Sequence, residues 1–92
     1  MAVKILTVCG AGVGTSEILR VTAQRALQRL GIEAEVQATD SVHVHDLAED
    51  AQVILATADT VTAIGRTYAQ VIVIEHILDL AEVEAKLADA LD

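Results

Sequence analysis

Short β-branched segments alternate with segments of helical periodicity along this chain, and that alternation constrains its fold more than any other feature. The expected strands are 3–8, 33–38, 52–57 and 70–74, and the expected helical segments are 15–30, 44–49, 60–64 and 79–91. Residues 53–56 and 71–74 are apolar at every position, which is typical of strands buried on both faces. We therefore predict an α/β three-layer sandwich built on a four-stranded parallel sheet.

The connections between these segments suggest a strand order. Right-handed crossovers make 2-1-3-4 the simplest order, which places the loop after the first strand near the crevice where α/β proteins usually bind ligands. Gly31 is expected to end the first long helix, and Asp79 with Glu82 three residues later forms a capping-box-like start for the last one.

Length and composition limit the classes of function. The 92 residues support one hydrophobic core, so we expect a single domain over 1–92. Hydrophobic residues make up 53% of the chain and charged residues 22%, which excludes disorder. The formal net charge is -8 and Tyr68 is the only aromatic residue, so we expect no nucleic-acid partner.

The sequence also bears on location and on metals. No apolar run approaches the roughly 20 residues that cross a bilayer, so we expect a cytoplasmic protein without direct membrane insertion. Cys9 is the only cysteine, which excludes an intrachain disulfide and a thiolate cluster. His43 and His45 have no third close ligand, and together with His76 they are expected to be surface histidines, so no metal is predicted.

The first expected strand ends in a glycine-rich turn that opens with Cys9. Backbone N–H groups of such a turn, with the N-terminal end of the next helix, form a cradle for a dianion. The positive electrostatic potential of these N–H groups and of the helix end also favours a thiolate. We therefore expect a lowered pKa at Cys9 and attack of its sulfur on phosphorus. The predicted phosphate-binding loop consists of Gly10, Ala11, Gly12, Val13, Gly14, Thr15 and Ser16.

A plainer interpretation of this segment is a buried, inert cysteine followed by a turn, with Thr15 and Ser16 as N-caps. A nucleotide P-loop is excluded because no lysine precedes Thr15, and the dinucleotide fingerprint G-x-G-x-x-G is broken at the same position. The loop of cysteine phosphatases, C-x5-R, would need arginine where Thr15 stands. Without that charged clamp, a phosphocysteine passed to another acceptor is favoured over hydrolysis.

The segment VCGAGVGTS over 8–16, followed by Ile18-Leu19-Arg20, resembles the IIB component of bacterial sugar phosphotransferase systems. Within the lactose/cellobiose-like IIB superfamily, it is most similar to the ascorbate-type proteins. The resemblance extends over essentially the whole chain, including 31–36 and 71–75. It implies a sandwich like that of flavodoxin or the low-molecular-weight phosphatases.

The resemblance also implies a phosphoryl relay. A phosphohistidine of the IIA partner would donate to Cys9, which would phosphorylate an ascorbate-like carbohydrate bound by the membrane-embedded IIC transporter. No cofactor is implied at this step. Glu17 departs from what an anion site favours, because it places a carboxylate in the first helical turn.

The charge is unevenly distributed along the chain. Residues 1–30 hold four basic residues against one acidic residue, whereas residues 31–92 hold two against thirteen. Arg20, Arg25 and Arg29 could therefore dock a negatively charged phospho-donor, although a solvated helix face is an equally good interpretation.

Further polar residues should lie near Cys9 because they follow expected strands; these are Asp40, Thr57, Asp59, Glu75 and His76. Two alternatives to a phosphoryl carrier are also open. One is a small cysteine phosphatase, which is disfavoured because Thr15 stands where such an enzyme needs arginine. The other is a regulatory module in which Cys9 is oxidised.

Overall fold

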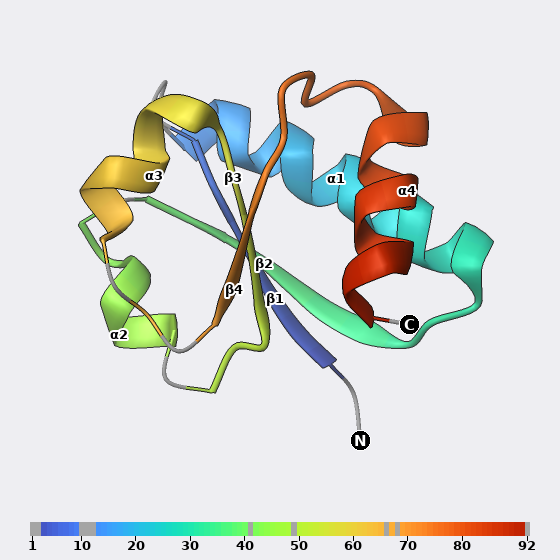
Figure 1. Ribbon diagram of the computed structural model, residues 1–92, viewed down its shortest axis with the longest axis horizontal. Helices are drawn as coiled ribbons and strands as arrows, with labels where there is room; N and C mark the ends of the chain where they lie inside the picture. The colour runs from blue at the N-terminus through green and yellow to red at the C-terminus, as the bar shows by residue number, and fades with distance from the viewer. Residues whose placement is uncertain are drawn as a thin grey trace.

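The computed structural model describes residues 3–9, 13–40, 42–48, 50–65, 67 and 69–91. Within them, strands and helices alternate along the chain (Figure 1). The elements are β1 (Val3–Val8), α1 (Val13–Leu30), β2 (Ala34–Thr39), α2 (Val44–Ala48), β3 (Val53–Ala56), α3 (Ala58–Ile64), β4 (Gln70–Val73) and α4 (Leu80–Leu91).

The four strands form one parallel sheet with the order β2-β1-β3-β4, which confirms the predicted topology. In the centre of the sheet, Val8 is opposite Thr39 of β2 on one side and Ala56 of β3 on the other. Since all strands point the same way, their carboxyl ends lie at one edge of the sheet. Cys9 directly follows Val8 at that edge.

The helices cover the sheet in two layers: α1 and α4 lie on one face, and α2 and α3 lie on the other (Figure 1). Side chains of β1 alternate between the two cores, so that Ile5 and Cys9 face α1 and α4 while Leu6 and Val8 face the opposite layer. The central strands β1, from Ile5 on, and β3 are therefore buried on both sides, which explains the continuous apolar sequence of β3. The apolar residues of β4 were expected to be buried in the same way, but β4 lies at the edge of the sheet and is only partly buried.

Helix α1 begins at Val13, two residues earlier than expected. Val13 and Gly14, predicted to be loop residues, are its first two residues. The helix ends as predicted at Gly31, which has a φ of 71°. There the N–H of Ile32 donates to the carbonyl of Leu27 at 3.0 Å, and the N–H of Gly31 donates to the carbonyl of Gln28 at 3.2 Å. This Schellman motif needs a left-handed residue, which glycine adopts at no steric cost.

The start of α4 confirms one half of the predicted capping box. The N–H of Glu82 donates to Oδ1 of Asp79 at 3.2 Å. The Glu82 carboxylate does not return to the cap residue but accepts the N–H groups of Glu75 at 2.7 Å and His76 at 2.9 Å. It thereby ties α4 to the segment that leaves β4. Among the helices described, none has the length and apolar character needed to span a bilayer.

Candidate functional site

Cys9 lies where the central strand ends and the chain turns toward α1. The N–H of Thr57, directly after β3, donates to the carbonyl of Val8 at 3.3 Å. This bond places the start of α3 beside Cys9. The side chain of Cys9 is 3% exposed and belongs to the same apolar cluster as Leu19 and Ala23 of α1.

The electrostatic surroundings of Cys9 correct one expectation from the sequence. Burial raises the pKa of the Cys9 thiol, and the negative charge of Asp59 raises it further. The predicted lowering of this pKa is therefore wrong for the described surroundings, which supply an apolar core and a carboxylate. In this state the thiol is protonated at neutral pH.

Of the predicted phosphate-binding loop, Gly10, Ala11 and Gly12 lie outside the described residues. Gly14 is exposed, and a Cβ added to it would meet no atom within 4 Å, so the space beside the first turn of α1 is open. The structure thus leaves room for a ligand at this point of the helix.

Thr15 and Ser16 lie inside the first turn of α1 and do not cap it, because the helix begins at Val13. Thr15 is half-buried, whereas Ser16 is fully buried. The hydroxyl of Thr7 on β1 donates to the carbonyl of Ser16 at 2.9 Å. This buried bond links the two ends of the segment that contains Cys9 and the predicted loop.

The three arginines predicted to dock a partner do not form one patch. Since a helix turns by about 100° per residue, Arg20 and Arg29 lie on opposite sides of α1. Arg20 pairs with Glu17 at 2.7 Å, and Arg29 pairs with Glu84 of α4 at 2.8 Å. Arg25 is exposed and makes no ion pair with any residue that the structure describes.

Arg25 lies on the rim of a groove of about 400 Å³ between α1 and the segment that leads into α4. Three large apolar side chains on this groove are exposed: Ile18 by 43%, Val21 by 41% and Leu78 by 77%. The remaining lining residues are Glu17, Thr22 and Leu80. Sequence reasoning missed this groove because Leu78 comes from a loop whose path depends on the contact between β4 and α4.

Asp40, one of the polar residues expected at the carboxyl edge, is used in a local turn with His43. Asp40 accepts the N–H groups of Val42 at 2.9 Å and His43 at 2.8 Å, and the His43 ring lies 2.9 Å from the same carboxylate. The hydrogen bond from the His43 side chain lowers the pKa of Asp40, and the same bond raises the pKa of His43. Both residues stabilise the start of α2.

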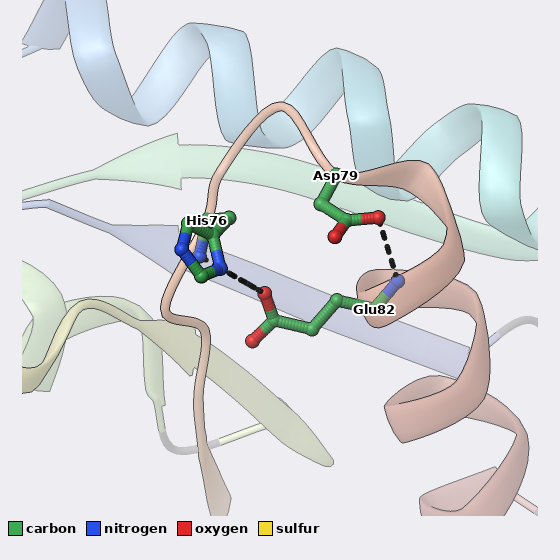
Figure 2. Close-up of side chains that lie close together, drawn as sticks. All are labelled: His76, Asp79 and Glu82. Atoms are coloured by element: carbon green, nitrogen blue, oxygen red, sulfur yellow. Dashed lines mark hydrogen bonds and ion pairs between the residues drawn. The ribbon is translucent and has the colours of Figure 1, made fainter.

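The other histidines also have structural roles. Nε2 of His45 lies 2.6 Å from the carbonyl of Ile64 at the end of α3, which connects α2 to α3. The structure brings His76 together with Asp79 and Glu82, so that one side-chain nitrogen or oxygen atom of each lies within 4.8 Å of those of the other two (Figure 2). The sequence did not predict this cluster.

Hydrogen bonds and an ion pair of Glu82 at the start of α4 account for this cluster. Besides the N–H groups of Glu75 and His76, the Glu82 carboxylate binds Nζ of Lys86 at 2.7 Å. Burial alone would raise the pKa of Glu82, but these hydrogen bonds outweigh it and lower the pKa to about 2. Lys86 also donates to the carbonyl of Val73 at 2.6 Å. The carboxylate is therefore already satisfied by the protein itself.

Comparison with solved structures defines the class of this fold. The chain is similar to the lactose-specific IIB component domain of the phosphoenolpyruvate:carbohydrate phosphotransferase system from Streptococcus pneumoniae. The two are 12% identical, the match covers 100% of each chain, and the TM-score is 0.73. At this identity the similarity shows the fold. No curated protein matches the chain.

The family follows from the sequence profile of the lactose/cellobiose-specific IIB subunits of the phosphotransferase system, which matches residues 4–89. The chain belongs to this family. It is thus a IIB component, a phosphoryl carrier in sugar transport, and the family implies IIA and IIC partners. The membership favours the carrier over the phosphatase and the regulatory module.

Proposed function

We propose that Cys9 is the residue of this IIB component that carries the phosphoryl group. The observation that carries the proposal is its position: Cys9 lies at the carboxyl end of the central strand, directly before the segment that enters α1. Ligands of open parallel sheets bind at this edge. The family match over 4–89 includes this position.

In the proposed step, Sγ of Cys9 attacks the phosphorus of a phosphohistidine on the IIA partner. The S–P bond forms, the N–P bond breaks, and the thiol proton passes to the imidazole of the donor. The backbone of the predicted loop over 10–16 binds the phosphoryl oxygens, and the N-terminal end of α1 favours their negative charge. In a second step a hydroxyl oxygen of the carbohydrate on IIC attacks the phosphorus, the O–P bond forms, the S–P bond breaks, and Sγ of Cys9 takes up the hydroxyl proton.

Because its pKa is raised, the Cys9 thiol is protonated before the donor docks. A protonated thiol is a weak nucleophile, so the sulfur gains its reactivity only when the donor is docked and its imidazole accepts the proton. Transfer is thereby restricted to the complex with IIA.

Intact-mass analysis after incubation with phosphorylated IIA tests the proposal. We expect one phosphoryl group on the wild-type chain and none on Cys9→Ala. Cys9→Ser is the closer control, because it keeps a small polar side chain of similar volume. A phosphoryl group that persists in both variants would place the carrier residue elsewhere.

For the acceptor we propose an ascorbate-like carbohydrate. Support comes from the resemblance of the segment over 8–20 to ascorbate-type IIB proteins. Lactose and cellobiose, which the family description names, are the competing acceptors. Phosphorylation assays with the cognate IIC in membrane vesicles, comparing ascorbate with the two disaccharides, distinguish them.

We further propose that IIA docks on α1 through the groove of Ile18, Val21 and Leu78. This apolar surface also carries Arg25, a cation that pairs with no residue in the described part of the chain. Such a surface suits a partner that brings an apolar segment and a phosphoryl charge. Arg20 and Arg29, already paired with Glu17 and Glu84, are expected to contribute less.

Leu78→Ser and Arg25→Gln test this docking site. Both residues are exposed, so the fold should persist. Each variant should raise the Kd for IIA about three- to tenfold, and Arg25→Gln should also reduce its salt dependence. Val42→Ser, at an apolar residue 78% exposed and outside the groove, is the matched control. Unchanged affinity in both groove variants would exclude this surface.

A further inference from the structure

Two carboxylates near the carboxyl edge of the sheet, those of Asp59 and Glu75, have no hydrogen-bond or ion-pair partner among the described residues, and Asp59 follows β3, the strand that pairs directly with β1. Asp59 is exposed in the first turn of α3, and its side chain makes no hydrogen bond or ion pair with any other residue that the structure describes. In the same region Glu17 pairs with Arg20, and Asp40 contacts His43. An uncompensated charge beside a site for an anion calls for a functional explanation.

The backbone fixes α3 close to Cys9. Val8 is in register with Ala56, and the N–H of Thr57 reaches the carbonyl of Val8 at 3.3 Å, so Cys9 and Thr57 leave the sheet side by side. Asp59 follows Thr57 by two residues. Helix α3 lies on the face of the sheet opposite α1, and among the described residues the charge that raises the pKa of Cys9 is that of Asp59 in the first turn of α3.

The other charged groups around Cys9 do not act in this way. On α1, Glu17 is neutralised locally by Arg20. After β4, the charge of Glu82 is compensated by Lys86, with His76 at 3.3 Å. Glu75 is exposed without a described partner for its carboxylate, but it follows β4, which β3 separates from β1 and Cys9. Asp59 is therefore the dominant charge that a phosphoryl group on Cys9 would meet from the described elements.

We propose that Asp59 sets the phosphoryl equilibrium of Cys9 by electrostatic repulsion, so that phosphocysteine remains a ready donor to the next acceptor. This inference rests on the proposed role of Cys9. The neutral thiol has no charge for Asp59 to repel, whereas the phosphoryl group carries nearly two negative charges close to the carboxylate. Asp59 therefore destabilises the phosphorylated form selectively, and the chemistry of the S–P bond is unchanged.

Asp59→Asn is the decisive variant, because it removes the charge at nearly constant shape. Asp89→Asn is the matched control: Asp89 is also an exposed aspartate on a helix without a described partner, but it lies near the far end of α4. Both variants change the net charge equally. Asp59→Glu keeps the charge and should behave like the wild type.

Two measurements report on the proposal. The ratio of phospho-Cys9 to free Cys9 at equilibrium with phosphorylated IIA, measured by intact mass, should rise about three- to tenfold in Asp59→Asn only. The 13Cβ chemical shift of Cys9, followed against pH, should show a lower thiol pKa in the same variant only. A purely structural role of Asp59 at the start of α3 would change the stability but neither of these readings.

The outcomes separate this inference from the proposed function. Identical equilibria in the wild type and Asp59→Asn, or equal shifts in Asp59→Asn and Asp89→Asn, would overturn the role of Asp59. If the wild type accepts no phosphoryl group, the role of Cys9 fails, and the NMR titration alone still tests the coupling of Asp59 to Cys9. If Asp59→Glu behaves like Asp59→Asn, the effect does not come from charge, and the proposal fails.

Discussion

The hydroxyl of Thr7 donates a buried hydrogen bond of 2.9 Å to the carbonyl of Ser16. Thr7 precedes Cys9 by two residues and faces the same layer of helices, while Ser16 lies in the first turn of α1. Both residues are fully buried. The bond therefore holds the two ends of the cysteine-containing segment at a fixed separation.

Replacing Thr7 by valine tests this link. The substitution preserves the shape but removes the donor, so we expect a loss of about 1 kcal/mol in the free energy of unfolding and slower phosphorylation of Cys9. Urea unfolding and intact-mass kinetics measure the two effects. Thr7→Ser, which keeps the hydroxyl, should retain the phosphorylation rate. A Thr7→Val variant as active and as stable as the wild type would show that the bond has no role.

The protonated state of Cys9 predicts its reactivity toward alkylating agents. Burial and the Asp59 charge both raise the pKa of the thiol, and only a thiolate reacts readily. At pH 7.5, Cys9 should react with iodoacetamide at least about tenfold more slowly than glutathione. The rate should approach that of glutathione in concentrated urea, where the cysteine is exposed. Fast alkylation of the folded protein would instead indicate a stabilised thiolate.

Glu82 should contribute stability that is sensitive to acid. Despite the opposing effect of burial, hydrogen bonds from Lys86 and two backbone N–H groups lower its pKa from 4.5 to about 2 in the folded chain. Its contribution is thus fully present above pH 4.5 and is lost as the pH falls toward 2. Glu82→Gln should cost about 1–2 kcal/mol at pH 7 and less at low pH.

Urea unfolding at a series of pH values measures this difference. Glu33→Gln is the control, because Glu33 is exposed and its side chain makes no hydrogen bond to the residues described. A difference between the wild type and Glu82→Gln that does not shrink below pH 4.5 would contradict the role of the Glu82 charge.

The Asp40–His43 pair predicts a second pH dependence, at the start of α2. The pKa of Asp40 is lowered from 3.8 and that of His43 is raised from 6.5, each through the other's side chain. The Asp40 contribution is present above pH 3.8, and the His43 contribution is present below pH 6.5 and is lost as the pH rises through the raised value. The pair should therefore stabilise most between these two pH values.

His43→Gln tests this pair. It should lower Tm at pH 5 more than at pH 8, and an NMR titration of the wild type should give His43 a pKa above 6.5. Because both side chains contact solvent, the change in Tm should be small. An equal loss at both pH values would show that the His43 charge does not contribute.

Much of the fold could be predicted from local patterns. The apolar segment 53–56 predicts a buried strand, and the glycine at 31 predicts a helix end. Both predictions succeed because burial of a short strand and the left-handed residue of a helix cap are specified by a few neighbouring residues. The position of Cys9 at the carboxyl edge follows from the strand order, which the handedness of crossovers restricts. The start of α1 at Val13 was misplaced, because glycine at position 14 suggests a loop although the helix accommodates it.

The sequence by itself determined the alternation of elements, the strand order and the family, because periodicity, handedness and the cysteine segment are all encoded in neighbouring residues. Only the tertiary structure decided the protonation of Cys9, the pairing of Arg29 with Glu84, the groove lined by Leu78 and the nearness of Asp59. These depend on which charges and apolar groups meet across different elements. Spacing along the chain does not specify such distances, whereas burial and Coulomb interactions depend on them directly.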